Sequence, residues 1–263
     1  MTDVLDLFGV PIQNCTTDEA LARLARFLLA PTRLPHAVFF VNAHTLNLAS
    51  ASPAYRSVLC SADQVFGDGT GVRWAARLVH SVRLAGNVNG TDLVPELLRS
   101  PPGRGLRYYL LGAQPGAIDR AAAHAARTFP AWTLAGHHHG YVPPDASGDV
   151  IDAINAARPE LLLVGMGNPR QEAWIAASRG RLRVPLVMGV GGLFDYWAGD
   201  LDRAPGWMRR LGVEWVHLLA HQPRKARRYL LGNPLFLGRV LVARRAARRA
   251  AGLLPSAPPD GPT

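Results

Sequence analysis

The sequence predicts an α/β fold: a mostly parallel sheet with helices on both faces, followed by a basic helical C-terminal appendage. From residue 38 to residue 199, short apolar runs alternate with segments of helical periodicity, which is typical of a parallel sheet. Several of these runs end in closely spaced glycines. In such folds a ligand lies beyond the carboxyl ends of the strands, so we expect the functional residues in the loops that follow them.

Each expected element rests on its local pattern. We expect strands over residues 38–41, 62–66, 107–111 and 132–135. We expect helices over 53–59 and 72–78, from the turn at 112–116 through 129, and over 149–157. A loop over 87–92 leads into an apolar helix, with Thr91 or Asp92 as its cap. Two apolar runs, from Leu161 and from Val184, enclose a further helix and complete the sheet.

The character of the chain changes after Gly206. Residues 207–221 have the pattern of an apolar helix, 224–228 form a basic cluster, and 230–252 are apolar and rich in arginine. In a helix, four of these arginines fall on one side: Arg244, Arg245, Arg248 and Arg249. We therefore expect an α/β domain over 1–206, a basic helical appendage over 207–254 and a disordered tail over 255–263.

Net charge is concentrated in the C-terminal end. Residues 1–202 hold 17 arginines and 17 acidic residues, whereas 203–263 hold 12 Arg or Lys against only Glu214 and Asp260. The whole net charge of +10 therefore comes from this end, which predicts an anionic partner there. The start of the chain is acidic, unlike a signal peptide, and no apolar run approaches the ~18 residues of a membrane span. We expect a cytoplasmic protein.

The glycine-rich segment from Gly165 to Arg170 predicts a phosphate-binding loop. It begins like a dinucleotide fingerprint, but Arg170 stands where the third glycine belongs. No acidic residue ends the next apolar run, where glycines stand over 189–192 instead. These departures argue against a nicotinamide cofactor and leave another phosphate-bearing ligand. The alternative is a helix start in which Gly and Pro only form the turn.

Three polar motifs could carry chemistry. Asp68 lies between two glycines at a strand end, where a carboxylate can serve as a general base, although a helix cap is the simpler role. The histidines over 137–139 point in different directions, so we expect a loop rather than a metal site. Asp200 and Asp202 match a pattern by which many glycosyltransferases hold a divalent cation, but we favour a solvated turn.

Together these segments resemble the WecG/TagA/CpsF family of bacterial glycosyltransferases. The matching segments occur in one order across most of the chain, which makes coincidence improbable. They are 42–47, 62–63, 67–71, 89–93, 110–116, 139–141, 164–172, 189–195, 198–199, 203–205, 214–215, 222–224 and 227–228.

The resemblance implies a Rossmann-like fold and a UDP-sugar-dependent hexosyltransferase without an obligatory metal. It implies inverting transfer of a sugar to a membrane-bound, lipid-diphosphate-linked acceptor, in the synthesis of a cell-surface polysaccharide or teichoic-acid-like polymer. The donor differs among members: N-acetylmannosamine, its uronic acid, or glucose. Some members carry a hydroxyl residue where this chain has Phe40, and several carry an arginine where it has Asn87, so no one donor can be carried over.

The resemblance also assigns roles to residues. It implies that Asp68 is the catalytic base. The leaving diphosphate gains charge and needs donors placed in advance, for which backbone N–H groups near Gly167 and Gly191 are our candidates. Asp195 would suit the ribose hydroxyls. The remaining expected substrate- and nucleotide-binding residues are Asn42, Thr45, Asn89, Asp92, Gly112, Tyr141, Gly165, Gln171, Glu172, Arg224, Arg227 and Arg228.

The basic appendage is expected to close the active site and to hold the enzyme at the anionic inner face of the cell membrane, as a peripheral protein. Two alternatives come from other classes. The pI of 10.7 and the arginine clusters fit a nucleic-acid-binding protein, but we expect no nucleic-acid partner, because the glycine and aspartate loops of the neutral body would have no purpose. The other alternative is an inactive sugar-nucleotide sensor. Homo-oligomer formation is left open.

Overall fold

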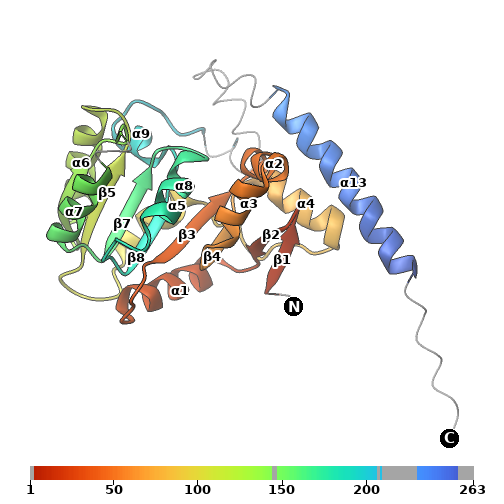
Figure 1. The fold of residues 1–263 in the computed structure, drawn as a ribbon, viewed down its shortest axis with the longest axis horizontal. Helices are drawn as coiled ribbons and strands as arrows, with labels where there is room; N and C mark the ends of the chain where they lie inside the picture. Colours follow the sequence, from red (N-terminus) through yellow and green to blue (C-terminus); the bar gives the residue numbers. More distant parts are fainter. Residues whose placement is uncertain (1–2, 144–146, 206–207, 209–229, 254–263) are drawn as a thin grey trace, which may run out of the picture.

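The computed structural model describes residues 3–143, 147–205, 208 and 230–253. Within them, one eight-stranded sheet has the order β1-β2-β4-β3-β8-β7-β5-β6 (Figure 1). Only the β1–β2 pair of this described sheet is antiparallel, and all other neighbours are parallel. This confirms the predicted fold class. The strands are β1 (Val4–Leu7), β2 (Val10–Gln13), β3 (His36–Val41), β4 (Gln64–Gly67), β5 (Arg107–Gly112), β6 (Thr133–His138), β7 (Leu161–Gly165) and β8 (Leu186–Gly189).

Helices cover both faces of the sheet, because successive strand residues point to opposite sides. Phe39 and Val41 enter one hydrophobic core, and Val38 and Phe40 enter the other. The first core is covered by α2 (Ala43–Ala51), α3 (Pro53–Cys60), α4 (Thr70–His80), α7 (Ser147–Ala157), α8 (Arg170–Ser178) and α13 (Gly232–Leu253). The second is covered by α1 (Thr17–Leu29), α5 (Gly90–Arg99), α6 (Ala117–Thr128) and α9 (Leu193–Trp197).

Two local expectations were wrong. The cap of α5 is Asn89, whose Oδ1 accepts the Asp92 N–H at 2.9 Å, and neither Thr91 nor Asp92 has that role. The histidine run was expected in a loop, yet β6 extends through His138, because His137 and His138 pair with Leu110 and Leu111 of β5. The β1–β2 hairpin and helices α1, α2 and α9 were not predicted at all.

Helix α13 lies along one side of the molecule and packs against α2 and α4 (Figure 1). Phe236 and Val240 are only 6% and 1% exposed and join the core that α2 and α4 cover. Asn47 of α2 donates to the Gly232 carbonyl at 2.7 Å, and Arg239 donates to the Asn47 side-chain oxygen at 2.7 Å. This part of the expected appendage is therefore continuous with the α/β core.

Several expectations for the C-terminal end fall outside the described residues. They concern the helix over 207–221, the basic cluster over 224–228 and the tail over 255–263. Among the helices that are described, none has the length and apolar character needed to span a bilayer.

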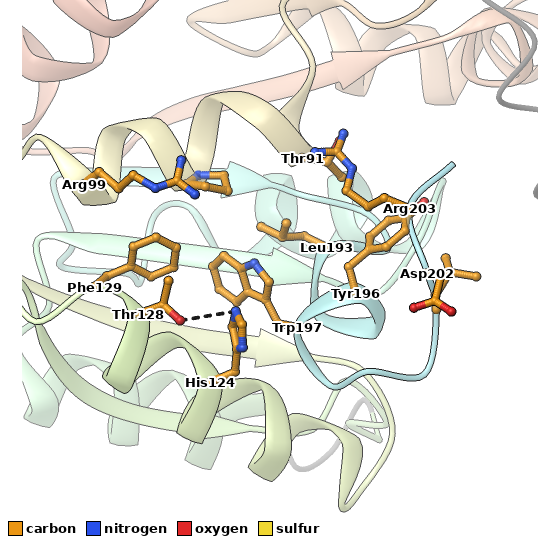
Figure 2. Close-up of a pocket in the computed structure, with 12 residues that line it drawn as sticks. Thr91, Arg99, His124, Thr128, Phe129, Leu193, Tyr196, Trp197, Asp202 and Arg203 are labelled. Carbon is orange, nitrogen blue, oxygen red and sulfur yellow. Dashed lines mark hydrogen bonds between the residues drawn. The ribbon is translucent and has the colours of Figure 1, made fainter. Parts of the chain in front are cut away.

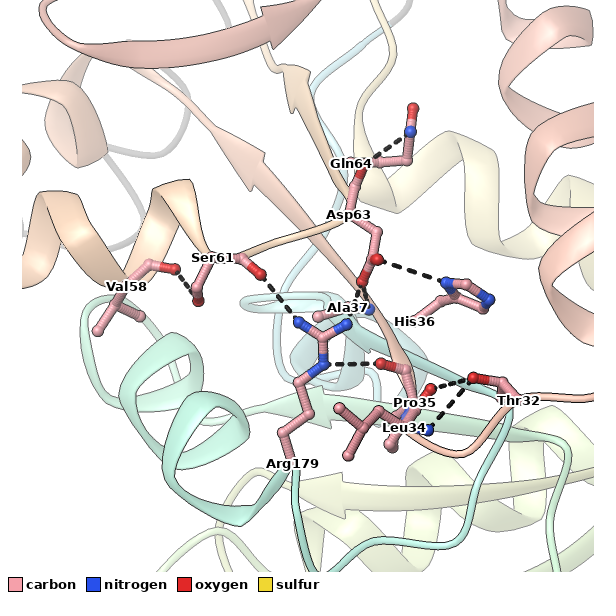
Figure 3. Close-up of polar contacts among 10 residues, drawn as sticks. All are labelled: Thr32, Leu34, Pro35, His36, Ala37, Val58, Ser61, Asp63, Gln64 and Arg179. Carbon is pink, nitrogen blue, oxygen red and sulfur yellow. Dashed lines mark hydrogen bonds and ion pairs between the residues drawn. The ribbon is translucent and has the colours of Figure 1, made fainter.

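The amino ends of the central strands are tied together by Arg179, which follows α8 (Figure 3). Its guanidinium pairs with the Asp63 carboxylate at 2.5 Å and donates to the carbonyls of Pro35 and Ser61 at 2.8 and 2.9 Å. Asp63 also accepts the Ala37 N–H at 2.8 Å. This cluster fixes β3 and β4 at the edge of the sheet opposite to the glycine loops.

Replacing Phe236 by Ala tests whether α13 belongs to the core. We expect the free energy of unfolding to fall by about 3 kcal/mol, because a buried aromatic ring is lost and a cavity is left. The neighbouring Leu235 is 52% exposed, so Leu235→Ala should change the value by no more than about 0.5 kcal/mol. Denaturant unfolding measures both, and equally small effects would show that α13 is not part of the cooperative core.

Candidate active site

The loops that follow the parallel strands meet at one edge of the sheet. Strand register aligns their ends, because Val41 pairs with Gly67, and Gly112 pairs with Gly165. The edge thus brings together several of the residues that the sequence singled out. They are Asn42, Asp68, Gly112, Tyr141, Gly165, Gly167 and Gly191.

Three glycines let these loops approach one another at backbone distance. A Cβ at Gly112 would overlap the Gly165 carbonyl, and a Cβ at Gly140 would lie 3.0 Å from the Gly112 Cα. A Cβ at Gly165 would lie 2.7 Å from the Phe194 ring and 2.9 Å from the Gly191 carbonyl oxygen. Real Cβ atoms essentially never show the distances at Gly112 and Gly165, and the distance at Gly140 is at the tight limit. The loops after β5, β6, β7 and β8 can therefore form one continuous backbone surface.

Gly167 and Gly191 have φ angles of +75° and +59°, a backbone conformation that residues with a side chain adopt only with strain. Their two loops differ in one respect. The Gly191 N–H already donates to the Gln171 side-chain oxygen at 2.9 Å. It is therefore held by the protein, which leaves the Gly167 loop as the better candidate of the two for contact with a phosphate.

Gln171 and Glu172 are buried beneath the loops, with exposed fractions of 1% and 0%. Three side chains donate to the Glu172 carboxylate: Asn168 at 2.5 Å and Gln171 at 2.8 Å to Oε1, and Tyr55 at 3.1 Å to Oε2. Burial raises the pKa of Glu172, while its donors from Gln171, Asn168 and Tyr55 oppose the rise. Both residues were expected to bind substrate or nucleotide, and the structure buries both beneath the glycine loops.

Asp68 lies at the end of β4, next to the end of β3. Its N–H donates to the Val41 carbonyl at 2.8 Å, and its side chain is half-buried. The next N–H, from Gly69, donates to the Asn87 side chain at 2.7 Å. β4 is three strand positions from β7, or about 14 Å at ~4.8 Å per strand. A sugar nucleotide can bridge this distance between the carboxylate and the Gly167 loop.

Other expected binding residues have structural contacts at the same edge. Asn42 caps α2 and accepts the His44 and Thr45 N–H groups at 3.0 and 3.2 Å, and Thr45 is buried. Asn89 caps α5 and also donates to Asp92 at 2.8 Å. These contacts give each of these side chains a structural role that needs no ligand. A role in binding for these residues stays a prediction.

Arg170 is a candidate site residue that the sequence reasoning missed. It begins α8, its guanidinium lies 5.7 Å from the centre of the exposed Tyr141 ring, and it contacts the Gly140 carbonyl at 3.4 Å. Within the described residues Arg170 has no acidic partner. Its place at a helix N-terminus directly after the glycine loop was the signal that could have found it.

A hollow of about 290 Å³ lies beside this edge, between α5, α6 and α9 (Figure 2). The rings of Phe129 and Trp197 line it with their centres 5.5 Å apart. Arg203 closes one side and pairs with Asp92 at 2.5 Å. The ion pair joins the N-terminal turn of α5 to the segment that follows α9.

The acidic residues near α9 have different surroundings. Asp195 lies in the first turn of α9 and is half-buried. Asp200 pairs with Arg120 at 2.5 Å, and Asp202 lines the hollow. In the part of the chain that the structure describes, no three His, Cys, Asp or Glu side chains are grouped for a metal. Arg224, Arg227 and Arg228 lie outside the described residues.

Comparison with known proteins gives a consistent set of relatives. A model of the family described as "Glycosyl transferase WecG/TagA/CpsF family" matches residues 5–250. A Staphylococcus aureus (strain MW2) protein named "N-acetylglucosaminyldiphosphoundecaprenol N-acetyl-beta-D-mannosaminyltransferase" is 28% identical over 249 residues, which covers 95% of this chain and 96% of the relative. A protein of the same name from strain MRSA252 is 29% identical over 250 residues, with the same coverage.

The raised pKa of Glu172 predicts a pH-dependent stability. In the unfolded chain a glutamate has a pKa of ~4.3. Between this pH and the higher folded pKa, Glu172 is protonated in the folded chain but ionised in the unfolded chain. The free energy of unfolding therefore falls as the pH rises through this range. Glu172→Gln removes this titration. We expect the Tm of the variant, relative to wild type, to increase as the pH rises from about 4.3 through the raised pKa and then to level off. A difference that does not change with pH would contradict the shift.

Proposed function

The chain belongs to the WecG/TagA/CpsF family of glycosyltransferases, and we propose that it transfers a hexosyl group from a UDP-sugar to a lipid-diphosphate-linked acceptor sugar, with inversion at the anomeric carbon. The relatives' names support an N-acetylglucosaminyl acceptor and an N-acetylmannosaminyl donor group. One structural observation carries the proposal. A half-buried carboxylate, Asp68, and the glycine loops after β7 and β8 lie at the same edge of the sheet.

Asp68 is the proposed catalytic base. It takes the proton from the acceptor hydroxyl as that oxygen attacks the anomeric carbon from the face opposite UDP. The new bond forms between the acceptor oxygen and the anomeric carbon, and the bond to the UDP oxygen breaks. UDP leaves with the electron pair, and the configuration at the carbon is inverted.

The leaving diphosphate gains charge and needs donors that are already in place. The Gly167 loop and Arg170 offer them, because a guanidinium presents a planar fork to phosphate oxygens. Arg224, Arg227 and Arg228 are proposed to add to this charge. Asp195 is proposed to bind the ribose. No obligatory metal is proposed, since Asp200 is engaged by Arg120.

The two departures from the family have different surroundings. Phe40 is only 7% exposed, and its ring packs against Phe66 and the start of α5. Asn87 is exposed and accepts the N–H of Gly69, directly after Asp68. We propose that Asn87 rather than Phe40 contributes to the choice of donor sugar, because of these two residues only Asn87 contacts the loop that carries the proposed base.

The acceptor is membrane-linked, and the outer surface of α13 suits a peripheral contact with the inner face of the cell membrane. Arg245, Arg248 and Arg249 are exposed in its C-terminal half. Exposed apolar side chains occupy its N-terminal half, and the neighbouring α4 exposes Trp74 by 62%. Basic and apolar groups on one surface are typical of interfacial helices. The apolar residues of α13 are Leu235, Leu237, Leu241 and Val242.

Asp68→Asn tests the proposed base. We expect kcat to fall about 100-fold or more with a UDP-sugar donor, because the amide cannot accept the proton. Asp200→Asn is the matched control and should leave kcat within a few-fold, in buffer and in chelator alike. Turnover of Asp68→Asn close to that of wild type would remove Asp68 from this role.

Charge substitution tests the membrane surface without disturbing the core, to which α13 contributes Phe236 and Val240. Replacing Arg245, Arg248 and Arg249 by Gln should weaken binding to anionic vesicles about 100-fold at low salt, at ~1 kcal/mol per basic residue. The control removes three exposed arginines from other surfaces: Arg104, Arg127 and Arg183. Vesicle sedimentation that gives equal losses for both triple variants, or no salt dependence, would argue against this surface.

A further inference from the structure

We propose that Glu172 is a positioning residue that holds the loops after β7 and β8 in the arrangement that binds the donor diphosphate. The ligand's identity rests on the proposed function, whereas the positioning role rests on the geometry alone. Glu172 has an exposed fraction of 0%, so it does not reach a ligand at the surface. Its effect on binding must therefore pass through the groups that it contacts.

The contacts of Glu172 connect separate parts of the chain. Asn168 donates to Oε1 from the loop after β7, in the residue directly after Gly167. Gln171 donates to the same oxygen at 2.8 Å from the first turn of α8. Tyr55 donates to Oε2 from α3, which is far away in the sequence. One carboxyl group thus fixes the loop after β7 against two helices.

The second loop is reached through Gln171. The amide nitrogen of Gln171 donates to Glu172, and its oxygen accepts the Gly191 N–H at 2.9 Å. The same side chain packs beneath Gly189, where a Cβ would lie 3.0 Å from the Gln171 nitrogen. Glu172 fixes which way the Gln171 amide faces, so the loop after β8 depends on Glu172 as well.

A carboxylate suits this position because it accepts hydrogen bonds without donating any. The three side chains that donate to it are uncharged and come from α3, α8 and the loop after β7. Glutamine can replace it with one adjustment: its oxygen keeps the Asn168 and Gln171 bonds, and its nitrogen donates to the Tyr55 hydroxyl, which can rotate to accept. Alanine leaves buried donors unsatisfied.

The test compares UDP binding by calorimetry in wild type, Glu172→Ala, Glu172→Gln and a control. We expect Glu172→Ala to bind UDP about tenfold more weakly, because buried donors lose their acceptor and the loops lose their fixed arrangement. Glu172→Gln should stay within about threefold of wild type. The control, Asp63→Ala, breaks the Arg179 cluster at the opposite edge, so it lowers the Tm but leaves UDP binding unchanged.

Hydrogen exchange gives a readout that needs no ligand. Glu172→Ala should exchange faster than wild type over residues 166–168 and 190–192, and Asp63→Ala should not. If Glu172→Ala does not fold, Tyr55→Phe removes one of the three donors and should give a smaller change in the same two segments. Binding and exchange equal to wild type in the folded variants would overturn the proposal.

Two further results are decisive. Equal damage from Glu172→Gln and Glu172→Ala would also overturn the proposal, because it would show that the charge and not the hydrogen-bond pattern is needed. If wild type itself does not bind UDP, the proposed function fails. In that case, hydrogen exchange over residues 166–168 and 190–192 still shows whether Glu172 positions the loops after β7 and β8.

Discussion

The close approach of backbone to backbone at Gly112, Gly140, Gly165 and Gly191 is the constraint on which the rest of the structure depends. A Cβ at Gly112, Gly140 or Gly165 would crowd the backbone of a neighbouring loop, and Gly191 has a φ of +59°, which favours glycine. The four loops therefore share one surface only with glycine at these positions. Parallel pairing brings the loops to the same edge, and glycine lets them meet there. Where no side chain covers the backbone, a phosphate can approach its N–H groups closely enough to accept hydrogen bonds.

Two carboxyl groups near this edge have environments that suit different tasks. Glu172 is fully buried, has a raised pKa and is surrounded by hydrogen-bond donors. Asp68 is half-buried at a strand end, where an acceptor hydroxyl can approach. The first is suited to holding structure and the second to moving a proton. Helix α13 is joined to α2 through Asn47, so the proposed membrane-facing surface is connected to the edge that carries the proposed active site.

The parallel strands from β3 to β8 and most of the helices could be predicted, because apolar runs and helical periodicity are local signals. The family could be recognised from the ordered motifs, and the match over residues 5–250 confirms it. The cap of α5 was missed because Asn89, Thr91 and Asp92 are all good caps and only the backbone geometry chooses among them. The burial of Glu172 and the packing of α13 depend on contacts between residues far apart in the sequence, which no local pattern records.

Hydrogen exchange of the wild-type protein with and without UDP tests the proposed diphosphate site most directly. A diphosphate bound at the glycine loops should slow amide exchange over residues 166–168, with the effect extending to 113–116 in the adjoining loop. Slowed exchange confined to the hollow around Trp197, or no change anywhere with UDP in excess, would contradict a diphosphate site at the carboxyl edge of the sheet.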